Sequence, residues 1–376
     1  MRRFFIIVTV LLGGLLVFSG LYGAYAQAVV EGRIIDIETK EPLQGAHVFF
    51  SGTTIGTSTG PDGRYVLRKI PPGAHRLVVS IIGYGRKKYD LMLGPEEQKT
   101  MDFGLKPVVY EMNELFVGDP DKKWKKRFRR FEDLFLGETK KADSITILNP
   151  EVLRFDSNFW GRLTAEALAP LKIENRALGY QITYYLDEFE HTGTRTRWDG
   201  EPVFTEMTSS DSLRQSRWEE NRREAFYGSL RHFLLALIHG RTEEEGFVLY
   251  RVRETIYDSF SENRFRVSPN RLIGEGKEPF LFKMKFNGRL EVIYTREKVD
   301  PHYRQWAQDT GQSLPASQVS WLELNESHIT IDTDGEVAEP YGATQMGYFA
   351  FERLADLTPR EYRPEGYAAW KGKLNK

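Results

Sequence analysis

The chain has 376 residues, with 52 lysines and arginines against 53 aspartates and glutamates, so its formal net charge is −1. This balance argues against a protein that binds nucleic acid through bulk positive charge. The sequence has no cysteine, which excludes disulfide bonds, thiolate nucleophiles and cysteine-based metal sites. The length is enough for two or three domains with sizeable cores.

The first 26 residues have the three parts of a secretory signal peptide. Residues 1–3 are basic, residues 4–18 are almost all apolar, and Ala24-Tyr25-Ala26 is a cleavage signal that leaves Gln27 as the new N-terminus. The alternative is an uncleaved anchor, because the apolar run approaches the ~20 residues that span a bilayer. No second run of that length follows. We therefore expect an exported protein with no transmembrane segment after signal cleavage, located in the periplasm, at the outer-membrane periphery or outside the cell.

Short apolar strands alternate with turn signals through residues 27–106, which predicts a small β-sandwich. The turns are rich in glycine and proline, as in Gly-Pro-Asp-Gly at residues 60–63. The expected strands cover residues 29–37, 46–50, 65–67 and 76–82, with closing strands near Leu91, Met101 and Phe103.

Several motifs in this region resemble the carboxypeptidase regulatory-like domain. They are Glu-Gly-Arg-Ile at residues 31–34, Pro-Leu-Gln-Gly-Ala-His-Val at 42–48, Gly-Thr at 56–57, Asp-Gly-Arg-Tyr at 62–65, Ile-Pro-Pro-Gly at 70–73 and Ser-Ile-Ile-Gly-Tyr at 80–84. The resemblance implies a transthyretin-like β-sandwich that accompanies zinc carboxypeptidase domains, or precedes TonB-dependent outer-membrane transporters, and is not itself catalytic. Gly60 stands where the family commonly has aspartate, which affects the turn more than the fold.

A linker is expected at residues 107–123, with one further strand considered at residues 108–117. An amphipathic helix follows at residues 124–135, because Trp124, Phe128, Phe131 and Phe135 recur at helical spacing. Residues 122–130, which begin with Lys122 and end with Arg130, contain seven lysines and arginines. This run could contact an anionic membrane surface or lipopolysaccharide. Alternatively, it is a solvated helix face whose aromatic side docks on the protein.

Residues 124–357 are expected to form an α+β domain with a mostly antiparallel sheet and one long helix at residues 213–238, and residues 358–376 a loose tail. The chain is thus predicted to be β-rich with two domains. Asn287-Gly288 and Asp334-Gly335 predict two hairpin turns. The expected strands are residues 171–174, 180–189, 194–207, 247–252, 280–286, 290–295, 320–324 and 328–331, with a short helix or strand at 347–357. This region is similar to uncharacterised bacterial envelope proteins, which adds no chemistry.

Sequence patterns for catalysis are missing. No His-Glu-x-x-His or His-x-x-Glu zinc motif occurs, and no Gly-x-Ser-x-Gly nucleophile motif. The segment that starts at Asp332 resembles a calcium loop, but Ala343 stands where the loop needs glutamate. We therefore predict no catalytic residue, cofactor or metal site. A dispersed pair of carboxylates leaves no local pattern and stays open.

One candidate binding surface lies on the long predicted helix, at Trp218, Asn221, Arg222 and His232. Asn221 and Arg222 could recognise a carboxylate or a glycan, or they could tie the helix to the sheet by buried hydrogen bonds. The leading hypothesis is a non-catalytic binding or scaffolding protein of the bacterial cell envelope, whose partner is an envelope protein or glycan. The alternatives are a hydrolase of peptides or glycans with a dispersed site, and an accessory factor of an outer-membrane transporter.

Overall fold

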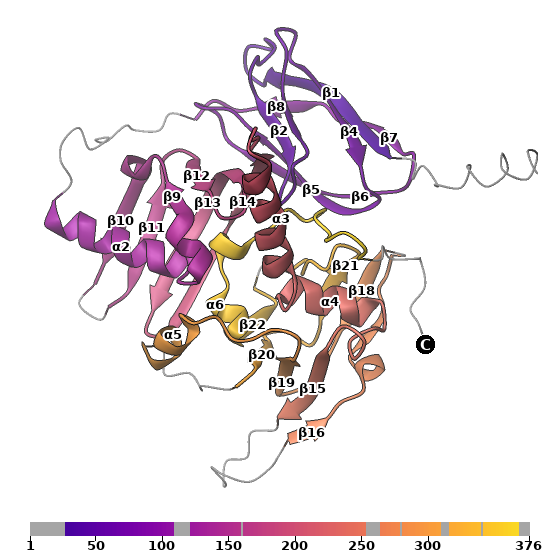
Figure 1. Cartoon of the computed structure of the whole chain (residues 1–376). Helices are drawn as coiled ribbons and strands as arrows, with labels where there is room; N and C mark the ends of the chain where they lie inside the picture. The colour runs from indigo at the N-terminus through magenta and orange to yellow at the C-terminus, as the bar shows by residue number, and fades with distance from the viewer. Residues whose placement is uncertain are drawn as a thin grey trace, which may run out of the picture.

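The computed structural model describes residues 27–108, 121–158, 161–252, 264–278, 280–309, 316–339 and 341–367. The predicted leader and residues 109–117 of the predicted linker strand lie outside these ranges. Figure 1 shows that the N-terminal strands form one body, beside which the later sheets are arranged. No helix in the described ranges combines the length and apolar character needed to cross a membrane.

The N-terminal body is a sandwich of two four-stranded sheets, which confirms the prediction. Alternate side chains of both sheets, such as Val30, Ile34, Leu77 and Val79, meet in a closed apolar core. The first sheet has the order β4 (Arg64–Ile70), β1 (Ala28–Asp36) and β7 (Gln98–Thr100), with β8 (Phe103–Leu105) also paired to β1. The second has the order β3 (Gly56–Ser58), β2 (His47–Phe50), β5 (Gly73–Ser80) and β6 (Lys87–Leu93).

A six-stranded antiparallel sheet, here called the central sheet, follows in the chain. Its longest strands form a hairpin, β13 (Tyr180–Thr192) and β14 (Arg195–Glu206). The other strands are β9 (Ile145–Ile147), β10 (Leu153–Ser157), β11 (Leu163–Ala167) and β12 (Leu171–Asn175). The predicted amphipathic helix is α2 (Lys122–Leu136), and its Phe131 and Phe135 are fully buried against this sheet.

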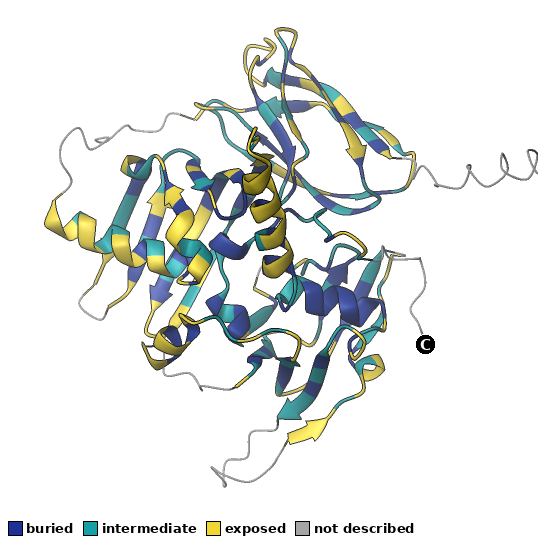
Figure 2. Cartoon of the chain, in the orientation of Figure 1, coloured by how far each residue is buried: buried dark blue, intermediate teal, exposed yellow. Residues whose placement is uncertain are grey.

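The last part of the chain has its own core beneath two further antiparallel sheets. Helix α4 (Leu230–Ile238) is almost entirely buried there, as its dark colour in Figure 2 shows. One sheet has the order β16 (Arg264–Arg266), β15 (Phe247–Val252), β19 (Arg289–Tyr294), β20 (Gln318–Leu324) and β22 (Ala343–Gly347). The other has the order β17 (Ile273–Glu275), β18 (Leu281–Met284) and β21 (Ile329–Asp332). The short helices α5 (Tyr303–Asp309) and α6 (Tyr348–Phe351) pack together beside them.

The long predicted helix is two helices, α3 (Ser212–Phe226) and α4. They are separated because Gly228 has a φ of 81°, outside the helical region. The hydroxyl of Ser229 then caps α4 by accepting a hydrogen bond from the backbone N–H of His232 at 3.2 Å. The prediction of one helix is therefore wrong at this break.

One predicted hairpin is also wrong. Gly288 has the expected positive φ of 74°, but the strands on either side of it belong to different sheets. β18 pairs with β17 and β21, whereas β19 pairs with β15 and β20. Gly335 has a φ of 77° in a tight turn after β21, which closes on one bridge between Ile331 and Val337.

The described part of the predicted loose tail, residues 358–367, is packed against the rest of the protein. Thr358 is buried, and the backbone N–H of Arg360 donates to the carbonyl of Gly52 at 2.7 Å. The tail prediction is wrong for these residues, because contacts with distant strands hold them in place.

The core of the sandwich is closed within residues 28–105, so a fragment of residues 27–108 is expected to fold alone. Its circular dichroism should be of the β type, and its thermal unfolding should be cooperative. It should melt at a lower temperature than the full chain, because Phe49 and Val78 lose their contacts with Tyr185 and Val203. A broad, non-cooperative transition would contradict the assignment of a self-contained core.

Candidate functional site

Three of the four predicted binding residues hold α3 against the turn that joins β12 to β13. The indole N–H of Trp218 donates to the carbonyl of residue 176 at 2.9 Å, and the Asn221 amide donates to that of residue 177 at 2.7 Å. The Arg222 guanidinium donates to the carbonyls of residues 178 and 179 at 2.7 and 3.2 Å. Trp218 and Arg222 are buried, so these side chains satisfy buried carbonyls instead of facing a ligand.

The fourth predicted residue, His232, is fully buried among aromatic rings of the last core. Its Nδ1 accepts a hydrogen bond from the backbone N–H of Gly228 at 3.1 Å, so the ring proton is on Nε2, which faces Glu245 at 3.4 Å. Burial lowers the pKa of His232. All four side chains thus have hydrogen-bond partners within the protein. Asn221 and Arg222 make the kind of hydrogen bonds that the second of their two alternatives describes.

Two further tryptophans, Trp198 and Trp321, are likewise packed within the fold. Trp198 contacts the core of the central sheet, where its ring lies 6.1 Å from that of Phe135. The ring of Trp321 covers Gly347, where a Cβ would lie 2.8 Å from the ring. Within the described ranges, no three histidine, aspartate or glutamate side chains are grouped so that they could hold a metal ion.

A cleft of about 510 Å³ lies where the sandwich meets the later parts of the chain. We call it the junction cleft. The sandwich contributes the loop after β2 and parts of β5 and β6 to its walls. The later parts of the chain contribute the middle of β14, Arg231 of α4, Leu281 of β18, the end of β21 with the turn after it, and residues 357–360. Its charged lining residues are Arg76, Asp90, Asp199, Glu201, Arg231, Asp332, Glu336 and Arg360.

Arg360 is the central side chain of the junction cleft. Its guanidinium donates to the carbonyl of Ala74 at 3.1 Å and forms an ion pair with the carboxylate of Asp332. Asp332 also accepts the backbone N–H groups of Asp334 and Glu336 at 2.9 and 3.0 Å. Burial raises the pKa of Asp332 to about 7, and Arg360 opposes this rise. One arginine thus links the sandwich to the turn after β21.

A second group of charges closes the cleft beside β14. Glu201, which is 2% exposed, lies 2.8 Å from Lys88 and 3.4 Å from Arg76. Both cations belong to the sandwich. Lys88 also contacts Asp187 of β13 at 2.6 Å. These pairs are partly shielded from water, so they fix the orientation of the sandwich more firmly than exposed pairs would.

Backbone pairing completes the attachment of the sandwich. The N–H of Gly52 donates to the carbonyl of Pro202 at 2.7 Å, and the N–H of Phe204 donates to the carbonyl of Thr53 at 2.9 Å. The loop after β2 therefore continues the central sheet along the free edge of β14. Next to this pairing, Phe49 and Val78 of the sandwich are buried against Tyr185 and Val203.

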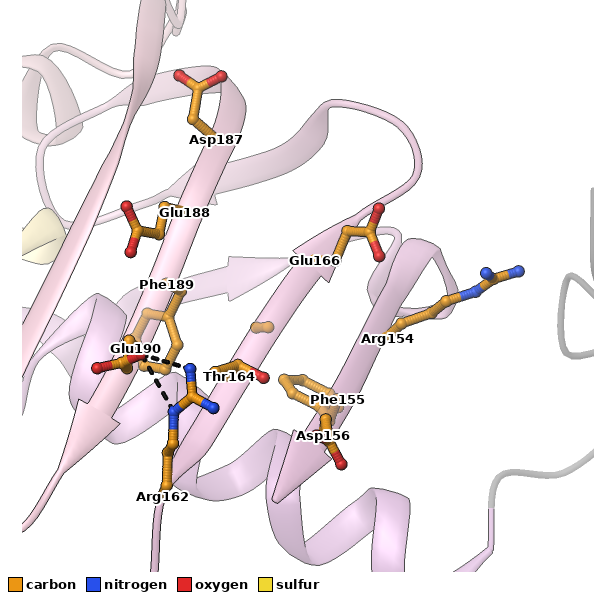
Figure 3. Close-up of a pocket in the computed structure, with 11 residues that line it drawn as sticks. Arg154, Phe155, Asp156, Arg162, Thr164, Glu166, Asp187, Glu188, Phe189 and Glu190 are labelled. Carbon is orange, nitrogen blue, oxygen red and sulfur yellow. Dashed lines mark hydrogen bonds and ion pairs between the residues drawn. The ribbon is translucent and has the colours of Figure 1, made fainter. Parts of the chain in front are cut away.

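A shallower concavity of about 350 Å³ lies on the face of β10, β11 and β13 (Figure 3). Asp156 and Glu166 project from it, while Glu190 is held by Arg162 at 2.7 and 3.1 Å. Glu188 is likewise paired, with Arg197 at 3.1 Å. We call this face the acidic concavity. It has fewer convergent groups than the junction cleft and is a weaker candidate for a ligand site.

Sequence patterns did not point to the junction cleft. Its key residues, Glu201, Asp332 and Arg360, are far apart in the chain and carry no local motif. The only available signal was an arginine-containing segment after Pro359, which by itself resembles many solvated termini.

The packing of Trp218 gives a test of the α3 anchor. Gly179 has a φ of 70°, and a Cβ at this position would lie 2.3 Å from the Trp218 ring. Gly193 has a similar φ of 61°, but a Cβ there would meet no atom within 4 Å. Gly193→Ala should lower the free energy of unfolding by about 1 kcal/mol, from backbone strain alone. Gly179→Ala should lower the free energy of unfolding by ~1–3 kcal/mol more than Gly193→Ala does, because the added methyl group overpacks the contact with Trp218.

Urea denaturation of the two variants measures this difference. Equal losses of stability in Gly179→Ala and Gly193→Ala would show that Trp218 does not press against the turn.

Comparison with known proteins identifies the N-terminal body. Residues 30–117 match the family of the CarboxypepD_reg-like domain. No curated protein matches the chain. Solved structures match part of the chain as well.

Three of these structures show the extent of the likeness. The 5-hydroxyisourate hydrolase of Klebsiella pneumoniae is 21% identical, with 22% of this chain and 92% of that chain covered and a TM-score of 0.19. The 3-chlorocatechol 1,2-dioxygenase of Rhodococcus opacus 1CP is 12% identical, with 22% and 60% covered and a TM-score of 0.20. The pilus 2b backbone protein of group B streptococcus is 18% identical, with 21% and 40% covered and a TM-score of 0.19. These values are too low to transfer an activity, so the comparison supports one conclusion: residues 30–117 match the CarboxypepD_reg-like domain family.

Proposed function

We propose that this chain is a non-catalytic binding or scaffolding protein of the bacterial cell envelope, in which the sandwich supports the parts that follow it. The observation that carries the proposal is the attachment of the sandwich. Backbone hydrogen bonds, an apolar contact and the ion pairs of Glu201 join it to the central sheet. Arg360, which is paired with Asp332, also donates to the carbonyl of Ala74 in the sandwich. A domain that is merely tethered needs no such combination of contacts.

The attachment also stabilises the rest of the chain. Without it, β14 would present an open edge, and Tyr185 and Val203 would be exposed beside that edge. Open, apolar strand edges are sites of aggregation. The sandwich therefore stabilises the central sheet and, by its position, forms one wall of the junction cleft.

The proposed location follows from the leader pattern at residues 1–26, which supports export. The junction cleft is the proposed binding site. Its apolar wall residues, such as Met92 and Val337, alternate with charged groups that are already paired within the protein. A peptide or glycan of the envelope that offers both apolar and hydrogen-bonding groups suits this lining.

The junction cleft also contains a candidate catalytic residue for the hydrolase alternative. Asp332 is an acid in a cleft with a pKa raised by burial to about 7, which is a property of many general acids. Its engagement with Arg360 and two backbone N–H groups favours a structural role, because a catalytic acid needs access to substrate.

An activity screen separates the two functions. The chain from Gln27 onward is incubated with peptidoglycan fragments, peptides and glycans, and both turnover and binding are measured. We expect saturable binding of at least one of these and no turnover. The control variants are Asp332→Asn and Glu201→Gln, which remove the two buried acids of the cleft.

Turnover that is lost in one of these variants, with an unchanged melting temperature, would overturn the scaffold proposal in favour of the hydrolase. Absence of both binding and turnover would remove the cleft as a binding site.

A further inference from the structure

Helix α2 has two faces of opposite chemistry. Its aromatic face, with Phe131 and Phe135 fully buried, packs on the central sheet, where Phe131 lies 4.7 Å from the ring of Phe189. Trp124 and Phe128 stack on each other at 5.0 Å within the same contact. The cations therefore occupy the outward face, which is exposed along most of the helix in Figure 2. The exposed basic residues are Lys122, Lys123, Lys125, Lys126, Arg129 and Arg130.

Two of the seven cations have partners that fix the helix to the sheet edge. Arg127 donates to the Ser157 hydroxyl at 3.0 Å, and its guanidinium also reaches the carbonyl of Phe155 at 3.4 Å. Arg130 lies 2.9 Å from Nε2 of His191. The Trp124 indole donates to the carbonyl of Leu153 at 3.2 Å. Trp124 and Arg127 together cover the outer edge of β10. The helix is thus attached by its aromatic face and by Arg127 and Arg130, which lie beside that face.

Four of the other cations lack ion-pair partners within the described parts of the chain. No acidic side chain there forms an ion pair with Lys122, Lys123, Lys126 or Arg129. We call these four residues the basic face. Lys126 lies four residues after Lys122 and three residues from both Lys123 and Arg129. At these spacings the side chains are neighbours on the helix surface, so their positive charges repel one another. Lys122 and Lys123 also stand in the first helical turn, where the helix dipole disfavours positive charge. The only acidic group described at this end is the N-cap Asp121, whose carboxylate accepts the backbone N–H of Trp124 at 2.6 Å.

The basic face therefore reduces the stability of α2 and has no role in its docking. A feature that costs stability without a compensating contact points to an external partner. The partner must be negatively charged. It must also be broad, because the four cations extend over about two helical turns, roughly 10 Å, and line no cavity.

We propose that the basic face of α2 docks on the surface of a phospholipid membrane that carries anionic head groups. The contact is electrostatic and peripheral, because the aromatic side chains are committed to the core and cannot insert into the bilayer. The phosphates of the head groups supply the broad negative surface that the basic face lacks within the chain. This inference goes beyond the proposed function and does not depend on the ligand of the junction cleft.

The test uses the purified chain from Gln27 to Lys376, so that the apolar leader cannot contribute. Cosedimentation is measured with vesicles of phosphatidylcholine alone and with vesicles that also contain phosphatidylglycerol. The variant Lys122→Gln/Lys123→Gln/Lys126→Gln/Arg129→Gln removes the basic face. A matched control removes four exposed cations elsewhere, as Arg214→Gln/Arg217→Gln/Lys277→Gln/Lys283→Gln.

We expect binding only to the anionic vesicles, and weaker binding as salt shortens the range of the charges. The basic-face variant should bind on the order of a hundredfold to a thousandfold more weakly, since each surface cation contributes about 1 kcal/mol, or about fivefold. The control variant should bind like the unmodified chain. Circular dichroism and melting temperature of both variants establish that they are folded.

Three results would overturn the proposal. The first is equal binding to neutral and anionic vesicles, and the second is unchanged binding of the basic-face variant. The third is the absence of vesicle binding, combined with self-association at low salt that the basic-face variant abolishes. That result would show that the basic face binds the acidic concavity of a second copy of the chain. Ligand binding by the junction cleft is measured separately, so its failure would not be mistaken for failure at α2.

Discussion

The ion pair between Arg360 and Asp332 is the contact on which the arrangement of the molecule depends most. Both side chains are largely removed from water, and the arginine also satisfies the carbonyl of Ala74 in the sandwich. Taking two charges out of water is costly, and it is offset only where further hydrogen bonds complete the geometry. The backbone N–H groups of Asp334 and Glu336 provide these bonds to Asp332. Displacement of the sandwich would take the Ala74 carbonyl away from the Arg360 guanidinium. It would also separate the buried carboxylate of Glu201 from Lys88 and Arg76.

Around this pair, the sandwich and the central sheet behave as one continuous structure. The loop after β2 extends the sheet beyond β14, and α2 covers the outer edge of β10 at the opposite side. Both of these edges are thus protected by parts of the chain that carry their own apolar contacts with the sheet. Function follows from this arrangement in two places. The junction cleft exists only because the sandwich is held beside β14, and the basic face points outward only because the aromatic face is buried.

Local sequence signals predicted the elements that depend on local chemistry. The strands of the sandwich are separated by glycine and proline turns, and α2 follows from the spacing of Trp124, Phe128, Phe131 and Phe135. Asn287-Gly288 correctly indicated a positive φ at Gly288. It did not determine pairing, because β19 lies between β15 and β20, whose residues are distant in the sequence. The break between α3 and α4 had a signal, a glycine followed by the helix-capping Ser229, but the continuous apolar pattern concealed it. The candidate site was not predictable: Arg360 acquires its role from Gly52, Ala74 and Asp332, which only the folded chain brings together.

The central claim is that the sandwich is a fixed support and not a tethered module. Native-state hydrogen exchange of the chain from Gln27 onward tests it at two amides that bridge the junction, Gly52 and Phe204, with Arg360→Met as the comparison. If the claim holds, both amides in the unmodified chain are protected nearly as well as those of the two adjoining cores. In Arg360→Met, which leaves Asp332 buried and unpaired, their opening free energy should fall by about 3 kcal/mol while the cores keep their protection. Rapid exchange of Gly52 and Phe204 in the unmodified chain, with both cores still protected, would contradict the claim.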